Sequence, residues 1–137
     1  MALSEFQLID RYFQALGPWR ADTLVGVGDD AAIVEMPADA DIVAVTAMLL
    51  LDLDQPAHGV ASQLGASLLT QLPDPSYQLQ WVLLALTLQQ GADSYVAAFA
   101  KEFDAWLRDH QVQLIGGDTT RGPSSAELQG VAVRRRT

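Results

Sequence analysis

The feature that most restricts the fold of this chain is a regular alternation between helix-like and strand-like patterns. Apolar residues recur every four positions over 59–72 and at helical spacing over 96–107, which predicts two amphipathic helices. Continuous apolar runs at 42–51 and 81–88 predict buried strands. The order is mixed, without an internal repeat or a linker, so the chain of 137 residues indicates a single α+β domain.

Shorter elements are predicted before these. Ser4 and Gln7 have the spacing of a capping box, and the helical periodicity that follows predicts a first helix of about three turns, which ends before Gly17-Pro18. The segment 24–34 is typical of a strand that is interrupted by a cluster of glycines and acids.

Two more strands are predicted at 111–115 and 127–134, on either side of a loop with the sequence GGDTTRGPSS. Asp93 or Ser94 is expected to cap the preceding helix. The predicted fold is therefore α+β, with a mixed or antiparallel sheet of about four to five strands that is covered by helices on one face. The aromatic side chains at helix or strand spacing are expected in the core and not on a base-stacking surface: Trp81, Phe99, Phe103 and Trp106.

The composition excludes several classes of function. Cysteine is absent, so disulfides, thiolate metal sites and cysteine nucleophiles are excluded, and nothing indicates an oxidising compartment. Seventeen acidic residues against eight basic ones give a formal net charge of -9, which would repel a nucleic-acid backbone. The basic run at 134–136 is expected to be a solvated tail.

Neither a membrane span nor a signal peptide is indicated. No apolar stretch reaches the ~18 to 20 residues that would cross a bilayer. The start, MALSEFQLIDRYF, is charged from Glu5 onward and lacks a basic segment followed by an apolar run. We therefore expect a soluble, cytoplasmic protein without a membrane partner.

Two glycine-acid segments carry the chemistry that this composition allows. GVGDDAA at 26–32 and GGDTTRGP at 116–123 each follow a predicted strand and place glycine beside aspartate. Glycine backbone can approach a ligand closely, and carboxylates suit magnesium, the ion that neutralises phosphates during phosphoryl transfer. Tight turns explain either segment alone at least as well, because both residue types favour turns. Neither segment is a Walker A motif or a dinucleotide fingerprint.

The order of these segments resembles that of the thiamine-monophosphate kinases. EFQLIDRYF near the start, GVGDDAA, WVLLALTL and the highly specific LIGGDTTRGP carry a match over almost all of the chain. The resemblance, which extends to the larger group around aminoimidazole ribonucleotide synthetase, implies that 1–137 is an amino-terminal domain that binds ATP and several magnesium ions. It also implies a homodimer in which the sheets of two subunits form a barrel.

The same resemblance implies roles for four residues. Asp30, Thr46 and Asp118 would contact magnesium, and Gly117 and Asp118 would contact the nucleotide. The implied activity is the ATP-dependent phosphorylation of thiamine monophosphate to thiamine diphosphate.

The chain departs from the family pattern at two metal positions. The expected Thr-Asp of the second strand is Thr46-Ala47, and the aspartate of the following helix falls on Gln71. The family's glycine, and its histidine that faces the thiamine substrate, are missing from 50–55. The second domain of the family has no counterpart within 1–137. Neutral side chains at the metal positions would leave phosphate charge poorly compensated.

These departures leave three functions open. The chain could be the nucleotide domain of a kinase, a non-catalytic module for dimerisation or nucleotide binding, or a heteromeric partner that adds its sheet to a complete kinase. We do not expect independent catalysis, and we favour a homodimer. Asp52 and Asp54 are weaker candidates for substitute ligands, because acids are common at strand ends. His58 is expected in solvent.

Overall fold

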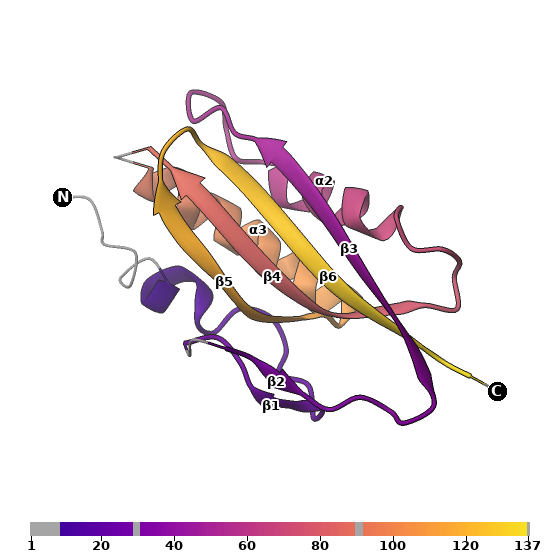
Figure 1. The fold of residues 1–137 in the computed structure, drawn as a ribbon. Coiled ribbons are helices and arrows are strands. Elements are labelled where there is room, and N and C mark those ends of the chain that lie inside the picture. The colour runs from indigo at the N-terminus through magenta and orange to yellow at the C-terminus, as the bar shows by residue number, and fades with distance from the viewer. Residues whose placement is uncertain (1–8, 29–30, 90–91, 137) are drawn as a thin grey trace.

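A four-stranded sheet forms the centre of the computed structural model, which describes residues 9–28, 31–89 and 92–136. Along the chain the elements are η1 (Ile9–Phe13), β1 (Thr23–Val25), β2 (Ile33–Val34), β3 (Ala40–Leu50), α2 (Val60–Leu69), β4 (Gln78–Leu88), α3 (Asp93–His110), β5 (Gln113–Arg121) and β6 (Ser125–Arg135) (Figure 1). The four long elements predicted from hydrophobic periodicity are confirmed as β3, α2, β4 and α3. No helix in the described residues is long and apolar enough to cross a membrane.

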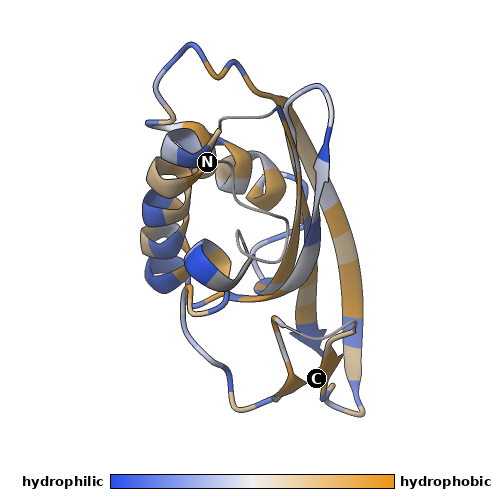
Figure 2. Ribbon diagram, turned by 90° about the vertical axis from the view of Figure 1, so that its left-hand side faces the viewer, coloured by the Kyte–Doolittle hydropathy of each residue, from blue (hydrophilic) through white to orange (hydrophobic). Residues whose placement is uncertain are grey.

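The sheet has the strand order β3-β6-β4-β5. β6 runs antiparallel to both of its neighbours, whereas β4 and β5 are parallel and are joined through α3. Parallel strands need such a crossover, because the chain must return to the end at which the first strand began. Both long helices cover one face of the sheet, and the small β1-β2 sheet lies near one end on the other side (Figure 2). The predicted mixed sheet with helices on one face is confirmed.

Successive side chains of a strand point to opposite faces of the sheet, and this decides which of them pack against the helices. On β3, Val43, Val45 and Leu49 pack into the main core. Ile42 and Met48 point to the other side and are 53% and 62% exposed. The largest fully buried side chains of the main core come mostly from the two helices: Leu64, Leu68, Phe99, Phe103 and Leu107. Each buried side chain of this size contributes about 1.5 to 3 kcal/mol.

A smaller core lies at one end of the other face. It contains Trp81, Ile115 and Val133, against which residues of the 32–40 segment pack. The indole Nε1 of Trp81 donates a hydrogen bond to Thr23 Oγ1 at 2.9 Å, and that hydroxyl donates to Gln113 Oε1 at 2.7 Å. These bonds fasten β1, which ends directly before Gly26, to β4 and β5. Trp81 is a core residue, as predicted.

Two predictions concern the residues at which helices begin. The capping box of Ser4 and Gln7 lies outside the described residues. α3 begins at Asp93, so Asp93 and Ser94 both lie inside the helix, and Ala92 occupies the N-cap position without a side-chain hydrogen bond. The predicted side-chain cap of α3 was therefore wrong.

The basic run at 134–136 is not a free tail as predicted. Arg134 and Arg135 belong to β6, and the guanidinium groups of Arg134 and Arg136 each donate to a carboxylate oxygen of Asp41 at 2.8 Å. The Arg134 guanidinium also lies 4.5 Å from the ring centroid of Tyr77. Hydrogen bonds from Arg134 and Arg136 hold the pKa of Asp41 below its ordinary value. The arginines thus fix the end of the β3-β6 ladder.

The amino-terminal end of α2 is capped from the other helix. Gly59 at the N-cap position has no side chain, and the backbone N–H groups of Gly59 and Ser62 donate to the Glu102 carboxylate at 2.7 and 3.1 Å. Burial raises the pKa of Glu102. The two hydrogen bonds, together with His58 at 3.7 Å, outweigh burial, and the pKa lies below its ordinary value of 4.5. Glu102 therefore joins α2 to α3.

Replacing Glu102 by Gln should lower the free energy of unfolding by about 1 to 2 kcal/mol at neutral pH, because a neutral amide is a weaker acceptor for the helix end. The carboxylate has a lowered pKa in the fold, so its contribution is present above pH 4.5 and is lost as the pH falls through the folded-state pKa. The stabilities of native chain and variant should therefore converge in acid. Chemical denaturation over a series of pH values measures this.

The matched control is Asp109→Asn, at an exposed position of the same helix. This variant should change stability by no more than about 0.5 kcal/mol. An equal loss in both variants would contradict the capping role of Glu102.

Candidate functional site

A hollow of about 290 Å³ lies on the open face of the sheet, the face opposite α2 and α3. Two alanines that end the first glycine-acid segment meet the second segment there. Its lining residues are Ala31, Ala32, Leu83, Ala85, Ile115, Gly116, Gly117, Asp118 and Gln129. Asp30, a predicted magnesium ligand, lies outside the described residues and directly precedes Ala31. The structure therefore brings parts of two segments together that are more than eighty residues apart in the sequence.

Gly117 lies in a strand and not in a loop as predicted. The pairing of β4 with β5 shifts register between Val82 and Leu83, and Gly117 is then paired with Leu84. Gly117 has a φ of 152°, and a Cβ atom at this position would lie 1.8 Å from the carbonyl oxygen of Leu84. Only glycine fits this close approach of the two backbones.

Asp118 presents an exposed carboxylate beside this glycine. Its Oδ1 accepts a hydrogen bond from the backbone N–H of Thr119 at 2.9 Å. Its neighbour across the strand pair is Ala85, whose small side chain leaves space around the carboxylate. Carboxylate oxygens next to uncovered backbone fit magnesium and a phosphate group chemically. Within the described residues, however, no group of three or more His, Cys, Asp or Glu side chains is placed to hold a metal ion.

Thr46 lies on the same face as Asp118 but at the opposite edge of the sheet. In the register Thr46 is opposite Gln129, and two strands separate β3 from β5. Neighbouring strands are about 4.8 Å apart, so Thr46 and Asp118 are separated by at least about 14 Å. One magnesium ion with ligand distances of about 2.1 Å cannot contact both side chains of a single chain. Thr46 Oγ1 instead donates to Glu127 Oε1 at 3.3 Å.

Ala47 and Gln71, which replace the two family aspartates, meet on the helix side of β3. Ala47 is 7% exposed and belongs to the main core. The amide Nε2 of Gln71 donates to the backbone carbonyl oxygen of Thr46 at 2.6 Å. The two positions are therefore neighbours in space, as a shared metal site would require. A methyl group and an amide N–H donor do not fit a cation, so we assign no metal to this pair.

Glu127 and Gln129, two polar residues of the open face, were not identified as site candidates from the sequence. Gln129 lines the hollow, and its Nε2 donates to Glu127 Oε1 at 3.2 Å. The alternation Glu-Leu-Gln over 127–129 already indicates that both polar side chains share one face of a strand. Their position relative to Asp118 depends on strand register and has no local signal.

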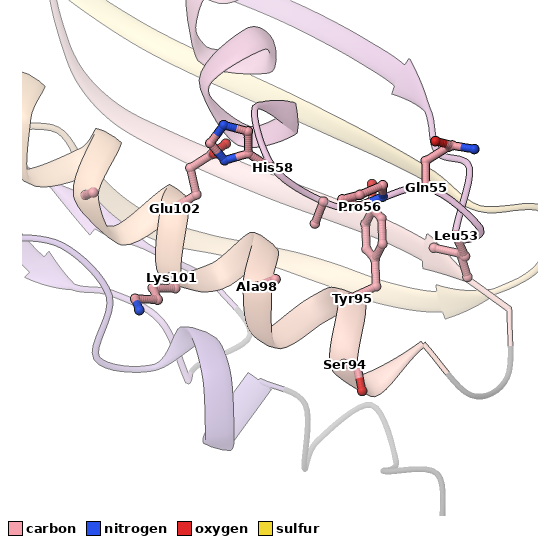
Figure 3. Close-up of a pocket in the computed structure, with 11 residues that line it drawn as sticks. Leu53, Gln55, Pro56, His58, Ser94, Tyr95, Ala98, Lys101 and Glu102 are labelled. Atoms are coloured by element: carbon pink, nitrogen blue, oxygen red, sulfur yellow. The ribbon is translucent and has the colours of Figure 1, made fainter.

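A wider hollow of about 640 Å³ lies on the helix side, between α3 and the segment 53–58 (Figure 3). The carboxylate of Glu102 is engaged in capping α2, and the side chain of His58 is 96% exposed, as predicted. Asp52 Oδ1 accepts a hydrogen bond from the backbone N–H of Asp54 at 3.0 Å, within the turn that follows β3. The polar groups around this hollow do not converge, and we assign no site to it.

Comparison with known proteins points to one enzyme family. The thiamine-monophosphate kinase of Salmonella typhimurium (strain LT2) is 37% identical over 134 residues, which cover 93% of this chain and 41% of the relative. The crystal structure of thiamine-monophosphate kinase from Stenotrophomonas maltophilia K279a matches with a TM-score of 0.77 and 32% identity, over 99% of this chain and 44% of that one. AaThiL complexed with AMPPCP and TMP shares the fold, with a TM-score of 0.61 and 19% identity over 80% of this chain and 37% of that one. No family model matches the chain.

The fold and the hollow define an α+β domain that carries a glycine-bordered carboxylate on the uncovered face of its sheet. With the relatives above, the chain belongs to the thiamine-monophosphate kinase family. It spans about two fifths of the length of the curated relatives that it matches, 41% in the case of the Salmonella enzyme.

Substitution of Gly117 by Ala should lower the free energy of unfolding by about 3 kcal/mol, because the new methyl group would overlap the carbonyl group of Leu84. The adjacent Gly116→Ala is the matched control. Its Cβ would lie 3.7 Å from Leu83 Cδ2, an ordinary contact, so a change of no more than about 1 kcal/mol is expected. Urea denaturation of both variants checks this, and similar losses would contradict the close approach at Gly117.

Proposed function

We propose that the chain is the nucleotide-binding domain of a thiamine-monophosphate kinase-like protein, with ATP and magnesium held at the hollow beside Asp118. The observation that carries the proposal is that Ala31 and Ala32, which end the first glycine-acid segment, line this hollow together with Gly116, Gly117 and Asp118 of the second. Support also comes from AaThiL, which is complexed with AMPPCP and TMP. The reaction of the family would be transfer of a phosphoryl group from ATP to thiamine monophosphate, which yields thiamine diphosphate.

The residues at the hollow would act by position and charge. Gly116 and Gly117 leave the backbone of β5 uncovered, so a phosphate could approach the strand closely. Asp118 would hold magnesium through its carboxylate, and the ion would neutralise phosphate charge. A nucleophilic protein side chain is not required, because phosphoryl transfer depends mainly on positioning and electrostatic stabilisation.

We also propose that the chain is degenerate or incomplete for catalysis by itself. Ala47 and Gln71 remove two negative charges from neighbouring positions at which the family pattern has aspartates. The chain also covers only 41% of the Salmonella kinase, so the full reaction is proposed only in combination with the remaining part of the family's length. Loss of carboxylates from a site that works by charge compensation would lower activity strongly.

A non-catalytic module for nucleotide binding or dimerisation is the second candidate, and the replacements at Ala47 and Gln71 favour it. Assays of thiamine diphosphate formation separate the two functions. Product formation from ATP, magnesium and thiamine monophosphate, by the chain alone or beside the remaining part of a related kinase, supports the enzyme. Binding of ATP without product in both assays supports the module.

We propose further that the open face of the sheet pairs with the same face of a second copy. Ile42, Met48 and Leu50 are 53%, 62% and 81% exposed on this side of β3. An apolar sheet face of this kind gains stability when a partner covers it. The alternative occupant is the sheet of a complete kinase in a heteromer.

Calorimetric titration of the chain with ATP and magnesium should give a dissociation constant of about 1 to 100 μM. Asp118→Asn should weaken this binding about tenfold or more, because an amide replaces the carboxylate that faces the cation. Asp109→Asn, at an exposed position of α3, makes the same change in net charge and should bind like the native chain. No binding at about 1 mM ATP would contradict a surviving nucleotide site. Equal binding by both variants would contradict the role of Asp118.

A further inference from the structure

The open face of the sheet carries a pair of acidic side chains in one row. The strand register places Glu127 of β6 opposite Ala85 of β4, and Ala85 opposite Asp118 of β5. Met48 of β3 completes the row on the other side of Glu127. The two carboxylates are therefore separated by one strand, at which the side chain is only a methyl group.

Glu127 is held on this face by neutral partners. Its Oε1 accepts hydrogen bonds from Thr46 Oγ1 at 3.3 Å and from Gln129 Nε2 at 3.2 Å. Across the four strands, the outward-facing residues in register with 44–50 of β3 include neither lysine nor arginine among those described. Arg20, which lies over the Trp81 ring at one end of this region, is paired with Asp22. None of the ion pairs in the described part of the chain involves Asp118 or Glu127.

The surface around the acidic pair is mixed: polar side chains such as Thr46 and Gln129 adjoin Glu127, and the large apolar side chains lie on β3. The helices lie on the opposite face of the sheet (Figure 2). Leu50 and Met48, which are 81% and 62% exposed, lie along its β3 edge. With strands about 4.8 Å apart and about 3.3 Å per residue, the uncovered area is roughly 500 Å². Among the described residues, only its β3 edge, with Ile42, Met48 and Leu50, exposes large apolar side chains. A partner sheet is the occupant whose shape matches such a surface.

We propose that Glu127 sets the partner preference of the open face, so that a homologous sheet with a basic side chain in place of Glu127 binds more tightly than a second identical copy. The inference rests on the sheet pairing proposed above. In a symmetric pair both copies use the same face, so each would bring Glu127 to one interface, and Asp118 as well when no cation occupies the hollow. A carboxylate that loses its water at the interface without gaining a cation opposes association. A basic side chain on the partner would supply that cation and favour association.

A charge-reversed copy of the chain provides the test partner. Glu127→Lys is mixed with the native chain, one of the two carries a mass tag, and pairs are quantified by native mass spectrometry and sedimentation equilibrium at about 0.15 M salt. We expect the mixed pair to bind about tenfold more tightly than the native pair. The uncharged Glu127→Gln should also pair with itself more tightly than the native chain does. A mixed pair no tighter than the native pair overturns the inference.

Two further variants make the result specific. Asp109→Lys changes the net charge by the same amount at an exposed position of α3, and it should not strengthen pairing with the native chain. If it strengthens pairing as much as Glu127→Lys does, overall charge is responsible and the inference fails.

Ala44→Glu adds an acid to the open face and tests the sheet pairing itself. If this variant weakens the native pair while Glu127→Lys changes nothing, the sheet pairing stands and only the role of Glu127 is refuted. If Ala44→Glu leaves the native pair unchanged, or if no mixture pairs at all, the proposed pairing through this face fails as well. Tighter formation of the mixed pair, together with weaker pairing of the native chain with itself, supports both.

Discussion

Burial of one sheet face by α2 and α3 is the constraint on which the rest of the structure depends. The helices take up the inward-facing apolar side chains of the strands, such as Val43 and Leu49 of β3. The carboxylate of Glu102 caps α2 from α3 and keeps the two helices together. Polar and glycine residues of the same strands are consequently left on the other face, where the hollow beside Asp118 lies.

Much of this fold could be predicted from the sequence, because it depends on local periodicity. α2 and α3 follow from apolar residues at helical spacing, and β3 and β4 follow from apolar runs. The part of β5 after Ile115 could not be predicted, because glycine is unfavourable in strands. The structure shows why a glycine stands at 117: the backbone of Leu84 lies too close for any side chain. The cap of α2 had no local signal either, because Glu102 is forty-three residues away from Gly59.

For the candidate site too, local motifs can be recognised in the sequence, whereas contacts between distant strands cannot. The two glycine-acid segments are visible as motifs, and the hollow contains Ala31 and Ala32 of the first and Gly116 to Asp118 of the second. Their roles in binding stay a prediction. The separation of Thr46 from Asp118 and the row that contains Glu127 both depend on the register of strands distant in sequence. A shift of one residue would move each side chain to the other face, so these relations cannot be obtained from single segments.

The methyl group of Ala85 is the only side chain between Asp118 and Glu127 in their row. The two carboxylates are separated by two strand spacings, about 10 Å, which is close to the screening length of ~8 to 10 Å at physiological salt, so a charge brought to one still acts on the other. A cation at Asp118 and a partner at Glu127 would therefore be energetically coupled. Such coupling is reciprocal: whatever factor the partner applies to cation affinity, the cation applies to partner affinity. The spacing at position 85 would then connect assembly with occupancy of the hollow without any movement of the backbone.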